Sequence, residues 1–214
     1  MIYDEVAKLI AGGGVREWAL DVLGDIAAGR TGVTAVRHPL GFLCLPLERA
    51  GGDGVCVHVW SPQIKSARIT TSPVHCHSWE LLSYVLYGHV ANVHVSVIDT
   101  AQDPTHRVFE VVSAPDKDVI RPIERTVRYE TIREEWIGPG ETYALDAGVF
   151  HMSIVSDGGE AATVALGREV PGHKNLSLGP LTTPLHHVTR ERCDQEETAR
   201  AAELVKRQLC ARDR

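Results

Sequence analysis

The sequence lacks any long apolar run. Its N-terminal stretch, MIYDEVAKLIAGGG, is acidic and contains only a short apolar segment. A membrane-spanning helix needs about 20 consecutive apolar residues, and a signal peptide begins with basic ones. We therefore expect neither a membrane span nor a signal peptide, and we expect a cytoplasmic location.

The sequence also lacks a basic stripe and paired cysteines. It has 28 acidic and 22 basic residues, a formal net charge of −6, which argues against a nucleic-acid-binding groove. There are five cysteines, an odd number, at positions 44, 56, 76, 193 and 210, and no two of them show C-x-x-C spacing. Reduced, buried thiols are the simplest interpretation.

Both ends of the chain show helical spacing. Apolar residues recur every three to four positions in 3–11 and 15–28, and a charged segment at about 190–211 has one apolar side. The 214 residues suit one domain with extensions. We expect an N-terminal helical extension at 1–30, a central domain at 31–170, and a C-terminal loop and helix at 171–214.

The central region changes to a period of two, which is typical of strands. Short alternating segments lie between glycine, proline and aspartate turns with no helices among them, which predicts an all-β sandwich or barrel. We expect residues 131–137 and 141–145 to pair with each other. The expected strands are 33–36, 41–47, 55–60, 67–71, 83–86, 90–98, 107–113, 119–130, 131–137, 141–145, 152–155 and 161–166.

Three histidines suggest a metal site. Residues i and i+2 of a strand point to the same face, so His75 and His77 can direct two imidazoles to one point, while Cys76 points the other way. His151 follows a glycine-rich turn and would come from a separate strand. Three neutral nitrogens suit a transition metal and leave coordination positions open.

These segments resemble the two motifs of the cupin superfamily, small β-barrels that hold a metal inside the barrel. The first motif continues to a glycine, here Gly88. The second keeps Pro139-Gly140, Gly148 and His151 in register, with Asp146 in place of a proline. The resemblance implies that the central domain is a single cupin barrel, a double-stranded β-helix or jelly roll, and by analogy that the protein is a homodimer.

The first motif departs from the family at its carboxylate ligand. The family register places Leu81 there, and Glu80 lies one residue early. Glu80 is then either a fourth ligand or a carboxylate beside the site at the strand edge. A site with three histidines and no carboxylate leaves more positive charge on the metal, which suits anionic substrates that chelate it.

The three-histidine pattern is similar to the thiol dioxygenase branch of cupins, which implies Fe(II) and O2. The chain lacks that branch's crosslinking cysteine, since Leu81 and Leu82 occupy the region, and its downstream Ser-His-Tyr relay. The resemblance implies an Fe(II)-dependent oxygenase or dioxygenase of a small anionic metabolite, and these departures argue against a thiol as that metabolite. The alternative is an isomerase, lyase or ligand-binding module that uses zinc, nickel or no metal; three histidines suit copper as well.

Three further residues are candidates for catalysis or substrate binding. His94 and Asn92 lie on the same face of residues 90–98. This face either lines the pocket, where His94 could accept or donate a proton, or meets solvent. Tyr143 either hydrogen-bonds substrate or oxygen, or is a half-buried core tyrosine. Arg68 either binds a substrate carboxylate or is solvated.

Overall fold

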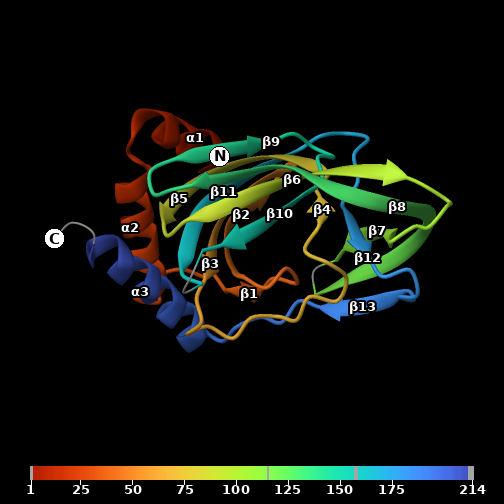
Figure 1. Ribbon diagram of the computed structural model, residues 1–214. Coiled ribbons are helices and arrows are strands. Elements are labelled where there is room, and N and C mark those ends of the chain that lie inside the picture. Colours follow the sequence, from red (N-terminus) through yellow and green to blue (C-terminus); the bar gives the residue numbers. More distant parts are fainter. Residues whose placement is uncertain (1, 115, 157–158, 212–214) are drawn as a thin grey trace.

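The computed structural model describes residues 2–114, 116–156 and 159–211. Three helices lie together at one end of the molecule, and the strands extend away from them in two sheets (Figure 1). Within the described residues no helix is long and apolar enough to cross a membrane.

The helices form where the apolar spacing predicts them. Helix α1 spans Ile2–Gly12, α2 spans Val15–Ala27 and α3 spans Gln195–Ala211. Their apolar sides pack against one face of the first sheet and form the largest core of the protein. Members of this core include Leu23, Val57 and Val205, each at most 1% exposed.

The first sheet has six antiparallel strands in the order β1-β2-β3-β11-β5-β9. In β3 the burial alternates, so Val55, Val57 and Val59 face the helices while the residues between them face the other way. The strands are β1 Val36–Arg37, β2 Leu43–Ala50, β3 Asp53–Trp60, β5 Trp79–Tyr87, β9 Thr142–Leu145 and β11 Ala161–Glu169.

The second sheet has seven strands in the order β13-β8-β6-β10-β4-β12-β7. Strand β7 also pairs with β8, so the far end of this sheet curls back on itself. The strands are β4 His75–Cys76, β6 Val90–Asp99, β7 His106–Ser113, β8 Lys117–Ile137, β10 His151–Val155, β12 Leu176–Gly179 and β13 His186–Thr189.

Several strand predictions are wrong. Residues 67–71 form no strand, because this segment is largely exposed and has no neighbour to pair with. Residues 131–137 continue β8 and pair with β6, whereas β9 pairs with β5 in the other sheet. Only Val36 of the expected strand at 33–36 lies in a strand. Strands β12 and β13 occur where a loop was expected.

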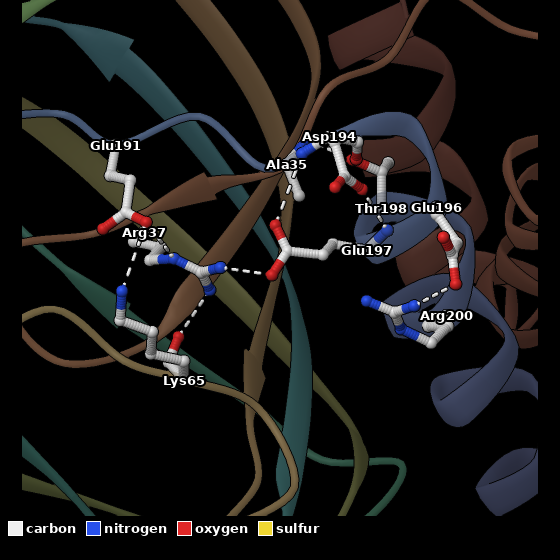
Figure 2. A network of polar contacts seen from close by, with 9 residues as sticks. All are labelled: Ala35, Arg37, Lys65, Glu191, Asp194, Glu196, Glu197, Thr198 and Arg200. Carbon is white, nitrogen blue, oxygen red and sulfur yellow. Dashed lines mark hydrogen bonds and ion pairs between the residues drawn. The ribbon is translucent and has the colours of Figure 1, made fainter.

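A buried arginine connects the C-terminal segment to the first sheet (Figure 2). Arg37 in β1 is 3% exposed, and its guanidinium lies 2.6 Å from the Glu197 carboxylate and 3.2 Å from that of Glu191. It also donates to the Lys65 carbonyl at 2.6 Å. Because a buried charge is costly unless it is paired, these contacts fix the start of α3 against β1.

Helix α3 begins with a reciprocal capping arrangement, also drawn in Figure 2. The Asp194 carboxylate accepts from the Glu197 backbone N–H at 2.7 Å, and the Glu197 carboxylate accepts from the Asp194 N–H at 3.4 Å. The Thr198 hydroxyl accepts from the backbone N–H of Ala35 at 3.1 Å. The helix start is therefore hydrogen-bonded to the residue that precedes β1.

Candidate metal centre

The structure brings His75, His77 and His151 together, as the motif spacing predicts. His75 in β4 lies directly opposite His151 in β10, and partners in an antiparallel pair point to the same face. His77 follows β4, and its carbonyl accepts from the Gly148 backbone N–H at 2.9 Å. The ring centroids are 4.4 to 5.0 Å apart.

Two glycines allow the turns that bring these strands together. Gly148 has φ +81°, and an added Cβ would lie 2.8 Å from Nδ1 of His173. Gly88 has φ +77° in the turn between β5 and β6, and an added Cβ would lie 2.3 Å from the Glu160 carbonyl oxygen. Both positions therefore require glycine.

Hydrogen bonds orient two of the three rings. Nδ1 of His75 donates to the Pro73 carbonyl at 2.8 Å, and Nδ1 of His151 donates to the Val149 carbonyl at 3.2 Å. Each bond leaves Nε2 with a free lone pair, which is the usual arrangement of metal-binding histidines. The third ring, His77, stacks on Trp79 with centroids 3.9 Å apart.

The three imidazoles are neutral at neutral pH. Burial lowers the pKa of His75 to about 4. Burial also lowers the pKa values of His77 and His151 well below the usual value, and the mutual repulsion of positively charged rings lowers them further. Neutral imidazole is the form that coordinates a metal.

The donor geometry fits a metal ion. One ligand nitrogen from each ring lies within 4.8 Å of the others. Two nitrogens that share one zinc ion are at most about 4.2 Å apart, twice a bond length of about 2.1 Å. Small ring rotations therefore bring the group to a binding geometry, and a three-histidine metal site is compatible with the structure.

The site opens on a cavity of about 500 Å³ between the two sheets. His75, His77 and Trp79 line one side, and residues of β2 and β3 line another. This volume is typical of sites for small molecules. The cavity therefore has room for a ligand next to the three histidines.

Two arginines contribute to the cavity wall. Arg190 forms a close pair with the buried Asp118, at 2.8 Å, so its charge is neutralised. Arg49, at the end of β2, forms no ion pair with any described residue. Arg49 is therefore the cavity's available cation, and sequence reasoning missed it because nothing in the local pattern separates it from other surface arginines.

The structure does not bring Glu80 or Arg68 to the three histidines. Glu80 is exposed and lies near Tyr3 of α1, where its charge contributes to raising the tyrosine pKa, an increase caused mainly by burial. Arg68 is exposed in the segment between β3 and β4. Neither residue is among the described residues that line the cavity.

Neither Tyr143 nor His94 is among the described residues that line the cavity. Tyr143 is 8% exposed in the core between the sheets, and burial raises its pKa. His94 in β6 lies directly opposite His151, and the Asn92 amide donates to its Nε2 at 3.0 Å. His94 therefore shares the face of the site without lining the cavity.

A second group of ligand atoms was missed by sequence reasoning. It consists of Cys44, Cys56 and His58. Each residue contributes one ligand atom, a sulfur or a nitrogen, and these atoms lie within 4.8 Å of one another. The Cys56 thiol and the His58 ring lower the pKa of the Cys44 thiol well below its usual value, against the effect of burial. The signal was present, because Cys56 and His58 have the same i, i+2 spacing as His75 and His77.

Comparison with models of known protein families finds no match for this chain, and comparison with curated proteins finds no significant match. What is established is an arrangement of two β-sheets with helices on one side, and a group of three histidines able to hold a metal. The cupin resemblance therefore rests on the two motifs and on the convergence of their histidines.

Proposed function

We propose that this protein is a metal-dependent cupin, and that it is an Fe(II)-dependent oxygenase of a small anionic molecule. The observation that carries the proposal is the group of His75, His77 and His151, which lies at a cavity of about 500 Å³. Neutral imidazoles with oriented Nε2 atoms suit a transition metal and leave open positions for substrate and O2. Bound iron would supply Lewis acidity and electron transfer to oxygen.

The cavity residues indicate how a substrate would be held. Arg49 offers a guanidinium without a carboxylate partner among the described residues, which suits a carboxylate or phosphate group on the substrate. Trp79 stacks on His77 and adds an apolar surface to the cavity wall. Because Arg49, His75 and His77 line the same cavity, one small anionic molecule in it could contact both the guanidinium and the histidines.

A second candidate function is non-oxidative chemistry on zinc or nickel. The observation that favours it is the absence of a carboxylate from the three-histidine group in the described chain. Three histidines with an open position are also the ligand set of catalytic zinc sites that activate water. An isomerase, lyase or ligand-binding module would use the same cavity without consuming oxygen.

The metal content of protein purified without air tests both candidates. We expect about one iron per chain in this site and O2 uptake with a carboxylate-bearing substrate, and we expect His151→Ala to lose both. His187→Ala, which changes an exposed histidine, is the matched control and should retain both. Zinc or nickel with turnover independent of air would support the second candidate, and full metal and turnover in His151→Ala would reject the site.

The homodimer also stays a prediction. Two large apolar side chains, Trp136 and Ile154, are 47% and 40% exposed and flank Ala91 on the second sheet. Exposed apolar side chains that lie together are common at subunit contacts. Light scattering of the purified protein measures the mass, and a mass of one chain would contradict the dimer.

A further inference from the structure

Cys44, Cys56 and His58 form a compact group on the first sheet. Cys44 in β2 lies directly opposite His58 in β3, and Cys56 precedes His58 by two residues on the same face. The Cys56 sulfur lies 3.3 Å from Nε2 of His58, and all three ligand atoms lie within 4.8 Å of one another. Two strands therefore hold three donor atoms in position.

The surroundings of this group also favour a bound ion. Cys44 is 2% exposed, whereas Cys56 lines the cavity. The His58 ring packs against Phe42, with centroids 4.4 Å apart, so its orientation is fixed. Of the three donors, Cys56 lines the cavity, so a fourth position beside its sulfur would face the cavity.

The other buried cysteines of the chain lack such partners. The hydrogen bonds of the Cys76 thiol go to backbone groups, among them the Lys174 carbonyl at 3.8 Å, and the residue packs in the core between the sheets. Cys193 belongs to the core beneath the helices. Of the cysteines described, Cys44 and Cys56 are therefore set apart, because each has a second thiol and an imidazole nitrogen within reach.

We propose that Cys44, Cys56 and His58 bind a second metal ion, a thiophilic d10 ion such as Zn²⁺, on the first sheet beside the cavity. Two thiolates and one imidazole prefer thiophilic ions and match the three-ligand sets that leave a fourth position open. The ion would be distinct from the metal at the three histidines, whose donors are all nitrogen and come from the second sheet and its adjoining segment. This proposal does not depend on the oxygenase function.

Cobalt substitution distinguishes the two sites, because a thiolate bound to Co²⁺ gives a charge-transfer absorption that an all-nitrogen site does not. Metal-depleted, reduced protein is titrated with Co²⁺ without air. We expect the charge-transfer band to saturate with one equivalent and a second equivalent to bind without adding to it. Added Zn²⁺ should then abolish the band.

Variants assign each signal. Cys56→Ser should lose the charge-transfer band entirely and still bind one equivalent at the three histidines, which also shows that it is folded. His151→Ala should keep the band and lose the other equivalent, so failure of one site is separable from failure of the other. Cys193→Ser with Cys210→Ser is the matched control, since it removes a buried and an exposed thiol outside the group, and it should keep both signals.

Three results would overturn the proposal. One is the absence of a charge-transfer band in the wild-type protein. Another is a band that survives Cys56→Ser, or that disappears in the control with Cys193 and Cys210 changed. The third is a disulfide between Cys44 and Cys56 in protein kept under reducing conditions, because it would consume both thiolates.

Discussion

Two groups of candidate ligands each have members that line the cavity, and they share a local sequence pattern but differ in their donors. On β3 the order is Cys56, His58 and Trp60, and at β4 and the start of β5 it is His75, His77 and Trp79, each at alternate positions. On β3 this spacing places Cys56, His58 and Trp60 on one face, and in the other segment Trp79 stacks on His77. The groups differ in two ligands: Cys56 stands where the other group has His75, and the remaining ligand is a thiol from β2 or an imidazole from β10.

The strands bring the donor atoms close together, and the chemistry of the side chains decides which metal they would prefer. Sulfur donors favour soft ions, whereas imidazoles bind zinc, copper, iron and nickel alike. The two groups also differ in their hydrogen bonds. The rings of His75 and His151 are oriented by backbone carbonyls, whereas Cys56 and His58 contact each other. The three-histidine group is therefore the more open to a ligand.

The largest expected effect is the response of the metal-free protein to acid. The folded-state pKa of His75 is about 4, below the usual 6.5, so the unfolded state binds more protons between these values. Stability is then fully present above about pH 6.5 and is lost as the pH falls toward 4. The loss from His75 alone is roughly 3 kcal/mol. Urea unfolding at a series of pH values measures it.

His75→Gln separates this effect from general acid denaturation. It should flatten the fall in unfolding free energy over this pH range relative to the wild-type protein, because Gln does not titrate. His187→Gln, at an exposed position, should leave the slope unchanged. An unchanged slope in His75→Gln would mean that the burial of this imidazole does not affect stability.

The next effect concerns the positive charge of Arg49 at the cavity. Arg49 lies at the cavity on the side of Cys44 and Cys56, whereas Arg68 is exposed outside it. Arg49→Gln should raise KM for an anionic substrate about ten-fold, equivalent to about 1.4 kcal/mol, with little change in kcat, because the lost contact is made equally in the ground and transition states.

Arg68→Gln is the control, and it also tests the residue that the sequence suggested. We expect its KM to equal that of the wild-type protein. Steady-state kinetics of the two variants with one substrate decide between them. A higher KM in Arg68→Gln alone would place the substrate's charged group at the mouth of the site and not at Arg49.

Much of the fold could be predicted because its signals are local. Helices α1 and α2 follow apolar spacing, and β3 follows a strict alternation. Strands β12 and β13 were missed because four residues between turns give too short a pattern. Pairing is less local still: β9 was assigned to its neighbour in sequence, whereas its partner β5 is more than 50 residues away.

The site shows the same limit. The three histidines could be predicted because their motifs carry fixed spacings, including Gly88 and Gly148 at turns that need positive φ. The role of Arg49 could not be predicted, because the pairing of β2 with β3 is what brings this residue to the cavity. Cys44 joins Cys56 and His58 through that same pairing, so only the Cys-x-His half of the second group was visible in the sequence.

The smallest expected effect is on metal affinity, after substitution of the tryptophan beside each group of ligands. It tests whether the two metal sites are independent. Trp79 stacks on His77 at 3.9 Å with 21° between the planes, whereas Trp60 meets His58 edge-on at 6.0 Å. Trp79→Leu should weaken metal binding at the three histidines by about 1 kcal/mol, roughly five-fold, because the ring loses its packing partner. Trp60→Leu should leave that affinity unchanged and alter only the thiolate-to-cobalt band. Cobalt titration of both variants measures each site separately, and equal weakening at the three histidines would show that the two groups are coupled through the cavity.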